Sequence, residues 1–119
     1  MEVFSKSDIG LVRTQNQDDC RFGVISPSCV WAVVCDGMGG ANGGNIASAT
    51  AVEYISTKIV DLYKEDMTKE QISELMVEIV ANANVKIFEL AAHDPELAGM
   101  GTTCEFVFVK DTTVHVVHV

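Results

Sequence analysis

Residues 30–44 read VWAVVCDGMGGANGG, an apolar run followed by a glycine-rich stretch. The run Val30–Cys35 is continuous and contains several β-branched side chains, which is typical of a strand buried on both of its faces. It places Asp36 at the C-terminal end of that strand. Five of the next eight residues are glycine, and we therefore expect residues 37–44 to form a loop.

Strand and helix patterns continue on both sides of this stretch. A turn signal containing proline, at residues 26–28, separates the apolar run from an earlier strand candidate. Apolar residues at helical spacing follow the glycines, and a second such series ends at Asp94-Pro95, because proline disfavours helical backbone in the preceding residue. The expected elements are strands at residues 1–9, 20–25 and 30–35, helices at 45–63 and 68–92, and strands at 104–109 and 112–119.

The second helix has the clearest boundaries. Thr68 is a suitable N-cap, and Gln71 three residues later completes a capping box. Glu70, Glu74 and Glu78 form a row that we interpret as a solvated helix face rather than a carboxylate site. The apolar faces expected to be buried are Val52, Ile55, Ile59 and Leu62 in the first helix, and Ile72, Met76, Ile79, Ala83, Ile87 and Leu90 in the second.

The order of these elements is βββααββ, with the two helices consecutive rather than alternating with strands. This order predicts an α+β fold and excludes a Rossmann-like arrangement. We expect a partial β-sandwich of largely antiparallel strands, with an antiparallel helix pair packed on one sheet.

Composition narrows the classes of function. The chain has 119 residues and a mass of 12.9 kDa, which fits one domain. Eight basic residues against 17 acidic ones give a net charge of −9, which argues against nucleic-acid or anionic-membrane partners. No apolar run approaches the ~20 residues of a membrane span, and no secretory signal pattern is present. We expect a cytoplasmic protein.

The cysteines and histidines do not form a recognisable metal or disulfide pattern. Four cysteines, at positions 20, 29, 35 and 104, include no CxxC pair. We expect them to be reduced thiols that pack as small hydrophobic side chains. The three histidines, at positions 93, 115 and 118, are expected to be packing or surface residues.

The sequence stops within an apolar strand pattern, at Val117-His118-Val119. We therefore expect residues 1–119 to be the N-terminal portion of a single longer domain. An apolar edge with unpaired backbone groups recruits other strands, so we also expect self-association of this chain through the sheet edge.

Two polar segments are candidates for chemistry. The glycine stretch lacks the lysine of a P-loop, and Asn42 stands where a dinucleotide fingerprint needs glycine. Asp36 followed by exposed backbone carbonyls would suit Mg²⁺ or Mn²⁺, although Asp36 could equally cap a turn that the glycines permit. Arg13 together with Asp18 could hold a phosphate beside a metal ion, or could form an ordinary solvated turn.

Taken together, the motifs resemble the protein phosphatase 2C family of metal-dependent serine/threonine phosphatases, in particular its bacterial branch. The resemblance covers nearly all of this chain but only about the N-terminal half of the family's domain. Later motifs of the family, Gly-Asp-Ser-Arg and two further aspartate motifs, are not present. The matching segments are Ser7-Asp8-Ile9-Gly10-x-Val12-Arg13, Asn16-Gln17-Asp18, Val34-Cys35-Asp36-Gly37-Met38-Gly39-Gly40, Gly44-x-x-Ala47-Ser48 and Gly99-Met100-Gly101-Thr102-Thr103.

The resemblance implies a role for each matching residue. Asp36 corresponds to the aspartate that bridges two Mn²⁺ or Mg²⁺ ions, and Gly37 to the residue that offers its backbone carbonyl to one of them. Asp18 corresponds to an acidic residue that orders metal-bound water, and Arg13 to the arginine that holds the substrate phosphate. Gln17 stands where glutamate is common, so its contribution to the metals would be weak.

Met38 stands where some eukaryotic members carry a histidine proposed as general acid. A thioether cannot donate a proton, so protonation of the leaving group would come from water or from a residue outside this chain. Met100, Thr102 and Thr103 are expected to be structural.

The implied function is dephosphorylation of phosphoserine and phosphothreonine proteins in signal transduction, with a cognate serine/threonine kinase as the opposing enzyme. Two metal ions in the complete domain would activate a water for in-line attack without a covalent intermediate. Because the later motifs are missing, we expect residues 1–119 alone to be inactive. The alternative is a non-catalytic half-domain or pseudophosphatase that binds a phosphoprotein or another partner.

Overall fold

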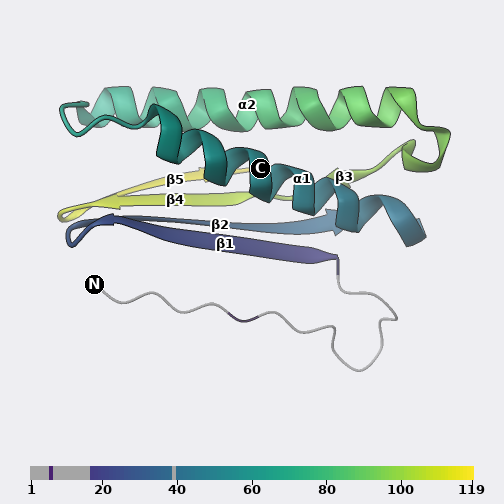
Figure 1. The fold of residues 1–119 in the computed structure, drawn as a ribbon, viewed down its shortest axis with the longest axis horizontal. Coiled ribbons are helices and arrows are strands. Elements are labelled where there is room, and N and C mark those ends of the chain that lie inside the picture. Colours follow the sequence, from purple (N-terminus) through teal and green to yellow (C-terminus); the bar gives the residue numbers. More distant parts are fainter. Residues whose placement is uncertain (1–5, 7–16, 39) are drawn as a thin grey trace.

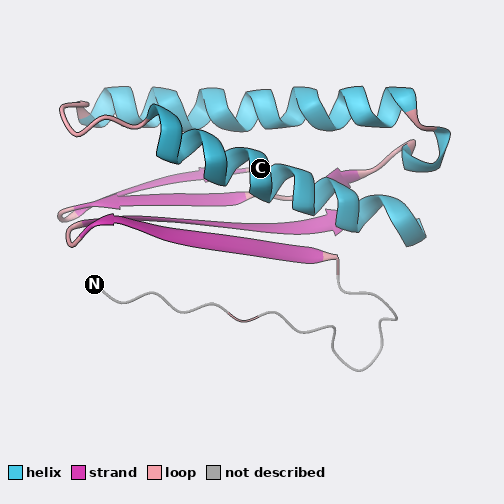
Figure 2. Ribbon diagram, in the orientation of Figure 1, coloured by secondary structure: helices cyan, strands magenta, loops and turns pink. Residues whose placement is uncertain are grey.

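The computed structural model describes Lys6 and residues 17–38 and 40–119. The strand expected at residues 1–9 therefore lies, except for Lys6, outside the described residues. Within the described part of the chain, an antiparallel sheet is covered on one face by two long helices, as Figures 1 and 2 show. This confirms the α+β class and the packing of the helix pair on one sheet.

The sheet consists of four main strands in the order β1-β2-β4-β5, all antiparallel. Two hairpins, at residues 27–28 and 111–112, connect neighbouring strands, and the two-residue strand β3 (Gly101–Thr102) pairs with the end of β2. Asp111 closes the second hairpin with a positive φ of 54°. The main strands are β1 (Asp18–Ser26), β2 (Cys29–Met38), β4 (Glu105–Lys110) and β5 (Thr113–His118).

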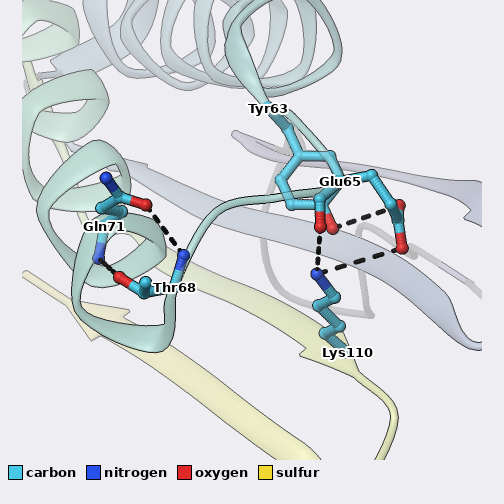
Figure 3. A network of polar contacts seen from close by, with 5 residues as sticks. All are labelled: Tyr63, Glu65, Thr68, Gln71 and Lys110. Carbon is cyan, nitrogen blue, oxygen red and sulfur yellow. Dashed lines mark hydrogen bonds and ion pairs between the residues drawn. The ribbon is translucent and has the colours of Figure 1, made fainter.

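The helices are α1 (Gly40–Leu62) and α2 (Lys69–His93), and a short 3-10 helix (Pro95–Leu97) follows α2. The predicted capping box is confirmed, because Thr68 Oγ1 accepts from the Gln71 N–H and Gln71 Oε1 accepts from the Thr68 N–H (Figure 3). Lys110 ties the second hairpin to the segment between the helices, since its Nζ donates to the Glu65 carbonyl at 2.7 Å. Neither helix of the described residues carries an apolar stretch sufficient to span a bilayer.

The core lies between the helix pair and the sheet. Most apolar positions predicted for the helices are buried there, but Leu62 and Leu90, in the last turn of α1 and of α2, are exposed. Leu75, which the spacing argument missed, is buried instead. The largest fully buried side chains are Phe106, Phe108, Ile55, Ile59, Ile72, Met76 and Ile79.

The opposite face of the sheet is apolar but uncovered by any described residue. The expectation that residues 30–35 are buried on both faces is wrong at Val34, which is 49% exposed, although Val30 is buried on this face. On β5, Val114 is 60% exposed. Phe22, Val24 and Val116 are exposed on the same face, as their strand partners indicate. This face is called the open face below.

The predicted glycine loop is also wrong in its extent. Strand β2 continues through Met38, and α1 begins at Gly40, so residue 39 alone separates the two elements. Glycine is unfavourable in a helix by about 1 kcal/mol relative to alanine, which is why the sequence indicated a loop. These glycines serve close packing instead: a Cβ on Gly37 would overlap the carbonyl of Gly44, and a Cβ on Gly43 would lie 2.8 Å from Met100 Cβ.

Replacing Gly37 by alanine should strongly destabilise the chain. The added methyl group would collide with helix backbone, which cannot rotate away as a side chain can, so we expect Gly37→Ala to lower the free energy of unfolding by about 3 kcal/mol. Gly101→Ala is the matched control, because its Cβ would meet only Met38, at 3.8 Å. Urea denaturation measures both. Equal unfolding midpoints for the two variants would contradict the packing described here.

Strand β5 lies at the edge of the described sheet and pairs with β4 alone. Exposed edge strands pair with other chains unless charged side chains prevent it. We expect the chain to self-associate at ~100 μM in sedimentation experiments, and Val116→Lys to shift it towards the monomer. A parent chain that sediments as a monomer at this concentration would contradict the prediction.

Candidate functional site

Two carboxylates face each other where β1 begins and β2 nears its end. The antiparallel register pairs Asp18 with Asp36, so their side chains project from the same face of the sheet. Both residues are exposed. That face is the open face, because Val34 lies two residues before Asp36 and side chains alternate along a strand. The structure thus brings together the two aspartates that the sequence singled out.

Gln17 and Gly37 lie beside this pair. The Gly37 N–H donates to the Gln17 carbonyl at 3.0 Å, which extends the contact between the two chain segments beyond the first residue of β1. A Cβ on Gly44 would lie 2.5 Å from Gln17 Oε1, so the first turns of α1 pack directly on the Gln17 side chain. Gln17, Gly37 and Gly44 therefore lie in mutual contact, from three separate segments.

Thr103 holds the backbone of Asp36 from the other side. The Asp36 N–H donates to Thr103 Oγ1 at 3.1 Å, and the Thr103 N–H donates to the Asp36 carbonyl at 2.9 Å. Sequence reasoning assigned Thr103 only to a turn. Its role as the partner of Asp36 has no local sequence signal, because the two residues are 67 positions apart in the chain.

The electrostatics of the pair favour a bound cation. Like charges directly opposite each other on neighbouring strands repel, and small hard cations bind carboxylate and carbonyl oxygens. Among the residues that the structure describes, no group of three or more His, Cys, Asp or Glu side chains could hold a metal ion by itself. The described donors therefore fit part of a metal site, with the remaining ligands still to be supplied.

Two thiols, Cys35 on β2 and Cys104 between β3 and β4, lie on the helix-facing side of the sheet. Cys35 and Cys104 are both buried. The neighbouring Cys104 thiol, together with burial, raises the pKa of Cys35 above its usual range. The Cys35 thiol in turn lowers the pKa of Cys104. None of the four cysteines is in a disulfide, as expected, and Cys29 is likewise buried.

The other candidates divide into three groups. Arg13 and Asn16 lie outside the described residues. Met38 is exposed on the open face, two residues beyond Asp36. Each histidine has a partner other than Asp18 or Asp36. His115 is buried and hydrogen-bonded to Ser73, His118 pairs with Glu105, and His93 bonds to the Glu89 carbonyl.

Comparison with known proteins gives consistent results. A putative protein phosphatase 2C-type protein from Streptococcus pyogenes is 32% identical over 120 residues, covering all of this chain and 47% of the relative. Protein phosphatase PhpP from Streptococcus pneumoniae is 33% identical over 119 residues, with the same coverage. This chain thus spans about half the length of the curated relatives that it matches.

Solved structures likewise match this chain over somewhat less than half of their own length. The serine/threonine phosphatase PstP/Ppp of Mycobacterium tuberculosis superposes with a TM-score of 0.80 at 26% identity, over 96% of this chain and 44% of that one. The S. agalactiae serine/threonine phosphatase gives a TM-score of 0.80 at 31% identity, over 93% and 45%. A sequence model of the family described as Protein phosphatase 2C matches residues 12–119. The chain therefore belongs to the protein phosphatase 2C family.

Proposed function

We propose that this chain is the N-terminal half of a metal-dependent protein phosphatase that acts on phosphoserine and phosphothreonine. The observation that carries the proposal is the placement of Asp36 directly opposite Asp18, beside Gly37 and Gln17. These are the residues to which the family resemblance assigns metal contacts. The names of the relatives, which are protein phosphatases, and of the solved structures, which are serine/threonine phosphatases, support the same reaction class.

In this proposal each residue has a distinct task at the cation site. The Asp36 carboxylate would bind two Mn²⁺ or Mg²⁺ ions, the Gly37 carbonyl would bind one of them, and the Asp18 carboxylate would accept hydrogen bonds from coordinated water. When bound, such an ion pair lowers the pKa of a water molecule and polarises the phosphoryl group. The two hydrogen bonds between Asp36 and Thr103 keep the backbone of Asp36 in place, so that its carboxylate is oriented before substrate binds.

The Gln17 amide is neutral and packs against Gly44. It would add little charge to the site and would mainly fix the position of Asp18. We assign the substrate phosphate to Arg13, whose planar guanidinium matches phosphate oxygens in pairs. The substrates would be cytoplasmic phosphoproteins produced by a cognate serine/threonine kinase.

The remaining ligands would come from a second half of the domain that covers the open face. Asp18 and Asp36 project from the face that also carries exposed Phe22, Val34 and Val116. Burying such a surface is favourable by about 25 cal/mol per Å². Chain packed against this face would therefore arrive next to the two carboxylates, where further oxygen ligands are needed.

The test compares phosphate release from a phosphothreonine peptide with Mn²⁺ present. Residues 1–119 alone should release phosphate no faster than buffer and bind Mn²⁺ only at roughly millimolar concentration, because they offer one direct carboxylate. A protein extended along its reading frame to the length of the relatives should be active. In that protein Asp36→Asn should reduce turnover by more than about 100-fold.

Asp66→Asn is the matched control, since Asp66 is an exposed aspartate in the turn between the helices, and it should retain full turnover. Activity of the extended protein that survives Asp36→Asn would refute the metal mechanism. An extended protein without turnover that still binds the phosphopeptide would favour the alternative, a pseudophosphatase or half-domain that recognises a partner. The observation that favours this alternative is the small number of metal donors among the described residues.

A further inference from the structure

Cys35 and Cys104 are cross-strand neighbours directly beneath the candidate site. The β2–β4 register pairs Val34 with Glu105, and the β2–β3 register pairs Gly37 with Thr102. Both pairings have the same offset, so the two residues between them pair as Cys35 with Cys104 and Asp36 with Thr103. The backbone hydrogen bond between Asp36 and Thr103 confirms this register.

The backbone of Cys104 turns its polar groups away from Cys35. Its N–H donates to the Val119 carbonyl at 3.0 Å, and its carbonyl accepts from the Val119 N–H at 2.9 Å. Cys35 and Cys104 are therefore a non-hydrogen-bonded pair, in which Cα atoms approach to about 4.5 Å. Disulfides span Cα separations of about 4.4–6.8 Å. The register therefore places the two thiols within the range at which a disulfide can form.

A groove open to solvent reaches Cys104. A largely apolar groove of about 310 Å³ runs between α1, α2 and the ends of β3 and β5, and Cys104 and Thr102 are among its lining residues. A peroxide is small and uncharged, so it can enter a groove of this kind. Cys35 is fully buried and has no contact with solvent of its own.

We propose that Cys35 and Cys104 are a reversible thiol–disulfide pair that hydrogen peroxide or an organic hydroperoxide oxidises. The Cys104 sulfur attacks a peroxide oxygen, the O–O bond breaks, and Cys104 becomes a sulfenic acid while water or alcohol leaves. The Cys35 sulfur then attacks the Cys104 sulfur, the S–O bond breaks, and a second water leaves with the Cys35 proton. Two thiols are oxidised, one peroxide is reduced, and a dithiol reductant reverses the reaction.

The disulfide would act on the residue that follows Cys35 in the chain. An S–S bond is about 2.05 Å long, much shorter than a contact between two non-bonded sulfur atoms, so the two segments must shift at this point. Asp36 and Thr103 are the adjacent pair and would move with them. The consequence for catalysis rests on the proposed function, because it assumes that Asp36 binds the metal ions.

Mass spectrometry of the 119-residue chain tests the pairing. The reduced chain, confirmed as folded by circular dichroism, is treated with hydrogen peroxide, its remaining thiols are alkylated, and it is digested with trypsin. We expect a loss of two hydrogen atoms per chain and a cross-link between the peptides 22–58 and 87–110. Cys35→Ser should abolish this cross-link. Cys29→Ser, which removes the other cysteine of peptide 22–58, should preserve it.

A chain oxidised in urea gives the reference for random pairing among the four cysteines. The proposal is overturned if the folded chain yields the same mixture of pairs as the unfolded one, or if Cys104 is oxidised to sulfinic acid without a cross-link. A cross-link that persists in Cys35→Ser would also overturn it, because the pair would then be misassigned.

Amide NMR spectra of the same samples test the link to the site. Oxidation should shift the Asp36 and Thr103 resonances more than those of Val30 and Val109, which pair at the far end of the same two strands. Unchanged Asp36 and Thr103 resonances would refute the link while leaving the disulfide intact. Neither measurement uses a metal or a phosphate, so failure of the proposed phosphatase function would not alter either result.

Discussion

The close approach of α1 to the end of β2 is the constraint on which the rest of the structure depends. A Cβ atom on Gly37 would collide with the backbone of Gly44, and the Gln17 side chain fills the space beside Gly44. Three glycines within the first five residues lower the helix propensity of this segment, so the start of α1 must be stabilised by packing. Because the helix is held there, Gln17 and Asp18 are brought against the end of β2, and Asp36 acquires its partner across the sheet.

This constraint also shows why sequence patterns predicted some parts of the fold and missed others. Helix α2 was predicted within about a residue at each end, because the capping box at Thr68 and the break at Asp94-Pro95 are local signals. The start of α1 was placed five residues late, because a run of glycines indicates a loop whatever packs on it. Among the described glycines only Gly99 has a positive φ, of 79°, so the need for the glycines at the end of β2 and the start of α1 is steric and depends on contacts that single-residue preferences do not record.

The candidate site was predictable in its composition but not in its arrangement. Asp36 and Asp18 were singled out by motif, yet their register across the sheet depends on the hairpin at residues 27–28 and on the irregularity near Val24. Thr103 and the Cys35–Cys104 contact were missed for a related reason. Each depends on pairing between segments almost 70 residues apart in the sequence, and a prediction based on local patterns contains no information about which distant strand pairs with which.

Because side chains alternate along a strand, two consecutive residues of β2 lie on opposite faces of the sheet and differ in their chemistry. Asp36 projects from the open face, where its charge can be balanced only by a cation or by further chain, and Cys35 projects into the core. A buried pair of soft sulfur atoms does not compete for a hard cation on the other side of the sheet, so the two groups can occupy adjacent positions without interfering chemically. They remain coupled mechanically, because the hydrogen bonds of Asp36 to Thr103 and the side-chain contact of Cys35 with Cys104 join the same two segments. Any change in the separation of the sulfur atoms must therefore be accommodated by the backbone that orients Asp36.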